Sequence, residues 1–284
     1  MLKFVPLDKS WIIRMGVLDI IHGYDDILQF LSAQPLLSDD LLALNRACIC
    51  WNTMYEMFVG ESGTLYRFLQ FASWKLGLNK RFMLAGSLKE RNIGRDPSIV
   101  HLTQRELLAL PGEPTTQWAS AAVLLGDRVR LADAPFKLRV TYAAVEHWEV
   151  QRNEGLTWKP ETDRTITTQA EVFVRLLRGE VTDFIAEQAE DYCFARMFSY
   201  LTRETGAKRW PSLAGHESNR LDEMEVVITS IRRGEMITSR DHRVVQAAVM
   251  WGLVNGVSVN ICYPEVVNKS WPEFWRFVAM HTKS

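Results

Sequence analysis

The sequence predicts an α/β or α+β protein of two domains, and three observations lead to this expectation. A chain of 284 residues is longer than a usual single domain, and its 47% apolar residues are ample for buried cores. Helical apolar stripes alternate along the chain with short β-rich runs. A polar segment at residues 151–168 contains Gly155 and Pro160, which favours a linker between the domains there.

The first helix is predicted over residues 63–76. A turn of small residues at 60–63 comes directly before it, and apolar residues then recur at helical spacing. These apolar residues are Leu65, Phe68, Leu69, Ala72 and Leu76. The pattern therefore predicts a turn that leads into a helix N-terminus.

A second helix is predicted to begin near Glu217 and to end at Gly234. Its apolar stripe consists of Leu221, Met224, Ile228 and Ile231. Glycine just after the last apolar residue is typical of a helix C-terminus. Arg220 is therefore expected in or just before the first turn of this helix.

Three short runs between such helices are predicted to be strands, at residues 128–131, 138–142 and 257–261. They are rich in branched and aromatic residues, and Asp and Gly residues punctuate them. Strands that alternate with helices favour an α/β or α+β architecture.

The charge balance restricts the possible partners. Lys and Arg number 33 against 34 acidic residues, so no global field favours nucleic acid or an anionic membrane, and any anion site must be built locally. No apolar stretch is long enough to span a bilayer, and charged residues interrupt the first fifteen residues. We therefore expect a cytoplasmic protein without nucleic-acid or membrane partners.

The four cysteines do not form a metal-binding pattern. They are Cys48, Cys50, Cys193 and Cys262. Cys48 and Cys50 are one residue closer than in C-x-x-C, and no second pair follows. The sequence therefore predicts reduced and mostly buried thiols and no metal site.

Short polar motifs recur in a fixed order along the chain. They are K-S-x-x-x-R at 9–14, G-E-S-G-T-L-Y-R at 60–67, T-T-Q at 115–117, E-S-N-R at 217–220, D-H-R at 241–243 and N-K-S at 268–270. Each motif alone is a weak signal, but their order resembles EPSP synthase, an enolpyruvyl transferase of the shikimate pathway. The resemblance runs from Lys9 to Phe274, although this chain is much shorter than typical members.

The resemblance implies a fold of two domains built of βαβαββ repeats, with some repeats trimmed or missing in this chain. Residues 1–15 and 160–284 would form a discontinuous lower domain, and residues 16–159 the upper domain. The active site would lie in the cleft between them.

The resemblance also implies a reaction and a set of residues. A carboxyvinyl group would pass from phosphoenolpyruvate to a hydroxyl of shikimate 3-phosphate or a related acceptor, with release of phosphate and without a metal or organic cofactor. Phosphoenolpyruvate would bind Lys9, Gly63, Arg220, Arg243 and Lys269. The acceptor would bind Ser10, Arg14, Thr115, Thr116, Gln117, Asp191 and His216.

The resemblance implies catalytic roles for four residues of this chain. Asp191 would handle the acceptor hydroxyl and Glu217 the methylene proton of phosphoenolpyruvate, while Lys269 and Lys9 would assist at the phosphoenolpyruvate side. The sister enzymes that act on a UDP-sugar usually carry a cysteine on a mobile loop. This chain has no cysteine between Cys50 and Cys193 and begins the first motif with Lys9-Ser10, which favours the EPSP synthase branch.

Four positions depart from the family pattern. Ser87 stands where the family has a phosphoenolpyruvate-binding arginine, Glu61 replaces an uncharged residue, Asp133 replaces a serine near the acceptor phosphate, and His216 replaces a lysine. A carboxylate repels a substrate phosphate. The departures leave a second hypothesis open, a non-catalytic homologue that binds an anionic metabolite or a protein partner.

Overall fold

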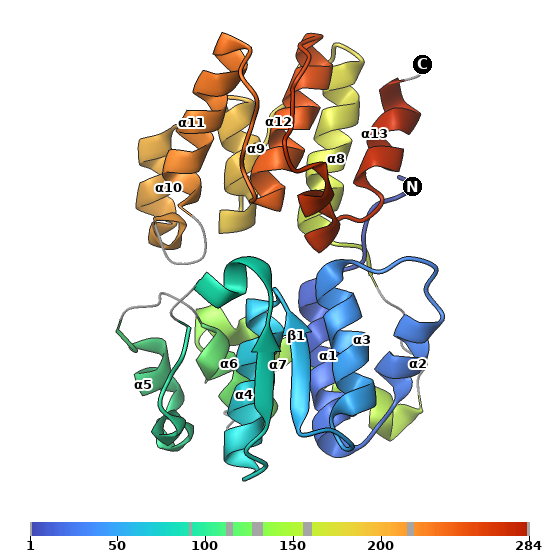
Figure 1. Cartoon of the computed structure of the whole chain (residues 1–284), viewed down its shortest axis with the longest axis vertical. Coiled ribbons are helices and arrows are strands. Elements are labelled where there is room, and N and C mark those ends of the chain that lie inside the picture. The colour runs from blue at the N-terminus through green and yellow to red at the C-terminus, as the bar shows by residue number, and fades with distance from the viewer. Residues whose placement is uncertain are drawn as a thin grey trace. The chain divides into compact units, whose positions relative to one another are not determined.

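The computed structural model describes residues 2–90, 93–111, 116–126, 133–155, 161–214 and 219–282 (Figure 1). The chain divides into two compact units. Unit 1 consists of Met1–Leu7 and Thr162–Ser284, and unit 2 of Asp8–Glu161. The boundary between the units falls after Leu7, and residue 15, after which the sequence analysis divides the chain, lies inside a helix of unit 2 that begins at Lys9.

Unit 2 is built around helix α1, which packs against α2, α3, α4 and α7, while α4 packs on α6. In chain order its elements are α1 (Lys9–His22), α2 (Asp26–Ser32), α3 (Asp39–Cys50), β1 (Glu56–Gly60), α4 (Gly63–Lys75), β2 (Arg81–Leu84), η1 (Gly86–Glu90), η2 (Pro97–His101), α5 (Gln104–Leu108), α6 (Gln117–Leu124), η4 (Phe136–Leu138) and α7 (Arg139–Glu154). Strands β1 and β2 pair in parallel, with α4 between them in sequence.

Unit 1 is helical in its described residues, and α12 lies at its centre in contact with α8, α9, α11, α13 and η7. Its elements are α8 (Arg164–Leu177), η5 (Ala189–Asp191), α9 (Tyr192–Met197), α10 (Arg203–Arg209), η6 (Pro211–Leu213), α11 (Arg220–Arg233), α12 (His242–Asn255), η7 (Pro264–Lys269) and α13 (Phe274–Thr282). Two apolar clusters form its core, and buried residues of α12 take part in both.

The first residues of the chain are bound into unit 1. Leu2, Phe4 and Val5 pack on its apolar core, and the Phe4 carbonyl accepts a hydrogen bond of 2.6 Å from Trp271 Nε1. Leu7 then forms an antiparallel bridge with Thr162. The backbone N–H of Asp8 also donates to the Glu161 carbonyl at 3.0 Å. The chain passes between the units at residues 7–8 and again at residues 161–162, and these two segments are therefore hydrogen-bonded to each other.

Both helices predicted from the sequence are confirmed. Helix α4 begins at Gly63, and α11 spans Arg220–Arg233 with Arg220 as its first residue. Gly234 ends α11 in the left-handed conformation at φ 70°, which glycine adopts without the steric cost of a Cβ atom. A turn signal followed by a helical stripe was sufficient in both cases.

The strand predictions agree less well with the structure. The strand prediction for residues 138–142 is wrong, because these residues belong to η4 and α7. The buried residues of α7, Thr141, Tyr142, Val145 and Trp148, follow helical spacing. In residues 257–261 only Ile261 pairs, through an isolated bridge to Ile237. The whole run at 128–131 lies outside the described residues.

The described chain is thus mostly helical, with one small two-stranded parallel sheet. This places it in a mixed class of helices and strands. The strand-rich βαβαββ repeats implied by the resemblance do not appear among the described elements, because tertiary packing has placed residues of β propensity on helices. No described helix is both long and apolar enough to cross a membrane.

The cysteines agree only in part with the expectation. All four are free thiols, and Cys193 is buried, but Cys48 and Cys50 are half-buried and Cys262 is exposed. The prediction of mostly buried thiols is therefore wrong for Cys262.

Candidate functional site

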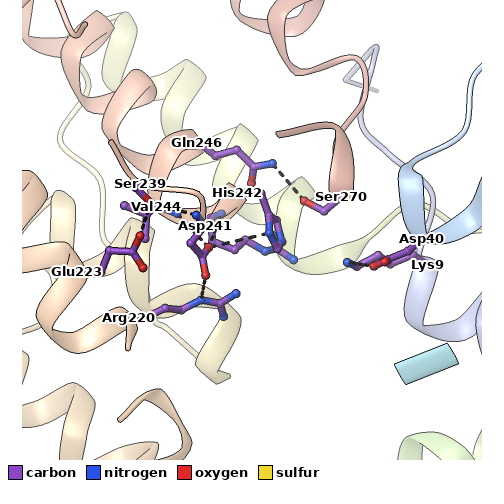
Figure 2. Close-up of polar contacts among 11 residues, drawn as sticks. Lys9, Asp40, Arg220, Glu223, Ser239, Asp241, His242, Val244, Gln246 and Ser270 are labelled. Carbon is purple, nitrogen blue, oxygen red and sulfur yellow. Dashed lines mark hydrogen bonds and ion pairs between the residues drawn. The ribbon is translucent and has the colours of Figure 1, made fainter. Parts of the chain in front are cut away.

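A buried polar cluster in unit 1 is centred on Asp241, which caps the N-terminus of α12. Its Oδ1 atom accepts hydrogen bonds from the backbone N–H groups of Arg243 at 2.8 Å and of Val244 at 3.4 Å. Its Oδ2 atom accepts one from Arg220 Nε at 2.8 Å, as Figure 2 shows. One carboxylate therefore joins the first residue of α11 to the first turn of α12.

Arg220 is held firmly in this cluster. Burial lowers the pKa of its guanidinium, but the carboxylate of Asp241 more than offsets this effect, so that the net pKa is raised. The guanidinium is therefore charged at every accessible pH.

Arg243 is also buried, with 5% of its side chain exposed. Its Nη2 atom lies 3.9 Å from Asp163 Oδ2, which is too long for a hydrogen bond. Its Nη1 atom is buried and donates no hydrogen bond to any residue that the structure describes. Asp163 is the N-cap of α8, so the N-terminal ends of α8, α11 and α12 meet around the two guanidinium groups.

Asp191 lies at the end of η5 in the same unit. Its carboxylate accepts hydrogen bonds from Gln169 Nε2 at 2.9 Å and from the backbone N–H groups of Glu187 at 2.9 Å and Gln188 at 3.2 Å. Burial raises its pKa, and these three donors and the charge of Arg243 oppose that rise. The structure thus brings Asp191, Arg220 and Arg243 into one unit with a fixed, buried carboxylate near a buried cation.

Lys269 is the last residue of η7, which packs against α12. The neighbouring Ser270 accepts a hydrogen bond of 3.2 Å from Gln246 Nε2, and both side chains are buried (Figure 2). Gln246 therefore fixes the end of η7 against the second turn of α12. Among the predicted residues, Thr115, His216 and Glu217 lie outside the described part of the chain.

Unit 2 contains the other predicted residues that the structure describes. Lys9 Nζ forms an ion pair of 2.6 Å with Asp40 Oδ2 on α3. Arg14 donates from Nε to Thr141 Oγ1 at 2.9 Å and from Nη1 to the Ser10 carbonyl at 2.7 Å. Burial lowers the pKa of Arg14 to about 10, with Asp8 opposing the shift.

A second network in unit 2 lies at the start of α6. Thr116 is its N-cap without a side-chain cap, and Gln117 accepts a hydrogen bond from Nη1 of the fully buried Arg67. Gln117 Nε2 in turn donates to Thr64 Oγ1 at 2.7 Å. Because Gly63 and Thr64 begin α4, the N-terminal ends of α4 and α6 are joined through one amide side chain.

Two departures from the family pattern can be placed in unit 2. The Glu61 carboxylate lies directly over Gly86, at which a Cβ atom would come within 1.7 Å of Glu61 Oε1. Gly86 also has φ of 46°, which favours glycine. Asp133 is exposed, and the side chain of Ser87 is not among those described.

Sequence reasoning missed several members of the unit 1 cluster, including Asp163, Gln169, Glu223, Ser239 and Gln246. Glu223 follows Arg220 by three residues on one helix, so the i, i+3 spacing could have indicated it. The other contacts join residues from separate elements, which a single sequence does not reveal. No group of His, Cys, Asp and Glu side chains in the described residues is arranged to hold a metal ion.

The arrangement in unit 1 can bind an anion and hold a carboxylate close by. A comparison of the chain with protein-family models, with curated proteins and with solved structures finds no match.

Proposed function

We propose that the chain is an EPSP-synthase-like carboxyvinyl transferase that binds phosphoenolpyruvate through Arg243. The observation that carries the proposal is the buried Arg243 guanidinium, whose Nη1 atom has no hydrogen-bond acceptor among the described residues. A buried charged donor without an acceptor is costly, and an anionic ligand would supply the acceptor.

The remaining residues supply the chemistry that the resemblance requires. Phosphoenolpyruvate has a carboxylate and a phosphate, and the guanidinium groups of Arg220 and Arg243 suit either group, with Lys269 as a point charge. Asp191 is supported as the base for the acceptor hydroxyl, because three hydrogen bonds orient it and its raised pKa makes the carboxylate more basic. Glu217 keeps its proposed role by resemblance alone.

In the proposed reaction the methylene carbon of phosphoenolpyruvate gains a proton while the acceptor oxygen bonds to the neighbouring carbon. Asp191 accepts the proton of that hydroxyl. Phosphate then leaves with the electrons of its carbon–oxygen bond, and loss of a methyl proton restores the double bond. No redox partner enters this sequence, and the acceptor is shikimate 3-phosphate or a related hydroxylated molecule.

The test is phosphate release from phosphoenolpyruvate with and without shikimate 3-phosphate. Release that requires the acceptor and falls at least about a hundredfold in Arg243→Gln and Asp191→Asn supports the proposal. Arg240→Gln is the matched control, since Arg240 precedes the same helix but lies over the Tyr263 ring at 4.7 Å. Release that is equal in Arg243→Gln and wild type overturns the role of Arg243.

A second candidate function is a non-catalytic homologue that binds an anionic metabolite. Two observations in unit 2 favour it, the Lys9–Asp40 ion pair and the carboxylate of Glu61 over Gly86. The first neutralises Lys9, which is implied to bind phosphoenolpyruvate, and the second is a carboxylate two residues before Gly63, which is implied to bind it as well. Calorimetry that detects phosphoenolpyruvate binding without any phosphate release, with every acceptor offered, would favour this candidate.

A further inference from the structure

Glu223 is connected to the centre of the unit 1 cluster, although the resemblance gives it no role. Ser239 Oγ donates a hydrogen bond of 2.5 Å to Glu223 Oε1 and accepts one of 3.1 Å from the backbone N–H of Asp241. Figure 2 shows Glu223, Ser239 and Asp241 lying side by side. The serine hydroxyl therefore joins the Glu223 carboxylate to the backbone of the residue that caps α12.

A change at Glu223 should reach both cations of the site. Asp241 binds Arg220 with one carboxylate oxygen and caps the backbone of Arg243 with the other. If Asp241 turns, Arg220 loses its ion pair and the first turn of α12 loses its cap. Ser239 fixes the backbone from which the Asp241 side chain extends, because its hydroxyl accepts a hydrogen bond from the Asp241 N–H.

The charges that face Glu223 come from three elements. Asp241 approaches from the segment before α12, Arg220 lies on the same helix, and the buried thiol of Cys193 belongs to α9. Burial raises the pKa of Glu223, the Ser239 hydrogen bond lowers it, Asp241 raises it and Arg220 lowers it, with a net rise. The charge of Arg220 therefore acts on two carboxylates: the buried Asp241, to which it is hydrogen-bonded, and the half-buried Glu223.

An anion that binds here adds negative charge to a cluster already rich in carboxylates. The charged form of Glu223 becomes less favourable when a neighbouring cation is shared with a ligand. Protonation of Glu223 relieves the repulsion and leaves the acid able to donate a hydrogen bond to Ser239.

We propose that Glu223 is a positioning residue of the unit 1 anion site, which holds Asp241 through Ser239 and takes up a proton when an anion binds. The inference rests on the proposed function for the existence of an anion site. It does not depend on catalysis, so the two can fail separately.

Sulfate is the probe for this test, since its charge stays constant between pH 5.5 and pH 8. Calorimetric titration of the full chain in two buffers of different ionisation enthalpy measures the protons taken up per sulfate bound. Wild type should take up a substantial fraction of a proton, and its affinity should rise as the pH falls, by at most about tenfold per pH unit. Glu223→Gln keeps an acceptor for Ser239 and should lose most of the proton uptake.

Two further variants separate positioning from general stability. Ser239→Ala should weaken sulfate binding about threefold to tenfold, because Asp241 loses its backbone partner. Glu171→Gln, which changes an exposed glutamate of α8 in the same unit, should bind sulfate like wild type.

The outcomes are distinct. Proton uptake that is unchanged in Glu223→Gln overturns the inference, whether or not the protein releases phosphate from phosphoenolpyruvate. Uptake that depends on Glu223 in a protein without any phosphate release leaves the inference standing and removes the proposed function. A wild-type chain that binds no sulfate at pH 5.5 overturns the anion site and the role of Glu223 with it.

Discussion

The polar networks of the two units use similar residues with opposite results. In unit 2 the fully buried Arg67 donates from Nη1 to Gln117, while its buried Nε atom has no acceptor among the described residues, and Lys9 is neutralised by Asp40. In unit 1 the buried Arg243 keeps an Nη1 donor without an acceptor among the described residues. Both arginines therefore keep one buried donor without an acceptor among the described residues, and they differ in the rest of the side chain: Arg67 bonds to Gln117, whereas the carboxylate of Asp163 lies 3.9 Å from Arg243. The comparison teaches that a hydrogen bond to the fold, rather than burial, separates a structural arginine from one available to a ligand.

The largest expected effect tests this difference directly. Arg67→Ala should lower the free energy of unfolding by about 3 kcal/mol, because it leaves a cavity and removes the donor of the half-buried Gln117. Arg243→Ala should cost only about 1 kcal/mol, because the costly buried donor disappears together with the side chain. Urea unfolding of both variants measures the difference. Equal losses would contradict the distinction between the two arginines.

A smaller effect is expected at the other cation of unit 2. Asp40→Asn should cost about 1 to 2 kcal/mol, since the ion pair with Lys9 is largely shielded from solvent. Asp39→Asn is the matched control, because it removes the same charge from the same first turn of α3. We expect the control to cost less than about 0.5 kcal/mol in thermal unfolding. A control that is as costly as Asp40→Asn would assign the effect to the helix dipole.

The pH dependence of stability sharpens the comparison for unit 1. The folded pKa of Glu223 lies above its unfolded value of 4.5, so the stability gained by protonation is present below pH 4.5 and is lost as the pH rises through the folded pKa. Glu223→Gln should therefore be more stable than wild type at neutral pH, with a difference that shrinks on acidification. Denaturant unfolding at several pH values between 4 and 7 measures this. A difference independent of pH would contradict the shift.

The smallest effect addresses whether the units unfold separately. Ser199 ends α9 with φ of 64°, a left-handed conformation that costs a non-glycine residue. Ser199→Gly should stabilise unit 1 by about 0.5 to 1 kcal/mol. Ser230→Gly, inside α11, should destabilise the same unit by about as much. A calorimetric scan in which both variants shift the same transition, and leave another unchanged, would establish independent units.

The sequence predicted what depends on local signals. Helices α4 and α11 follow turn residues and carry regular apolar stripes, so their position was readable. Residues 138–142 have β propensity, which led to the strand prediction. The apolar residues continue at helical spacing as far as Trp148, and the five residues considered were too few to show this spacing. Propensity is a weak guide wherever burial extends beyond the window.

The candidate site was readable only in its residue types. The resemblance implied that Arg220 and Arg243 bind an anion, whereas the Arg220–Asp241 pair joins residues 21 positions apart and was not predicted. Asp40 as the partner of Lys9 was equally hidden, since the two lie 31 positions apart. Whether a cation is available to a ligand depends on such long-range partners. The sequence therefore indicated the charged residues but not which of them are paired with a carboxylate of the fold.

The attachment of residues 2–7 to unit 1 has a consequence for synthesis of the chain. Unit 2 is continuous from Asp8 to Glu161 and can fold as soon as it has left the ribosome. Phe4, by contrast, must wait for Trp271 and for Arg276, whose guanidinium lies 4.4 Å from the Phe4 ring centroid. Residues 2–7 are therefore made before unit 2 but reach their folded positions only after residue 276 has been made.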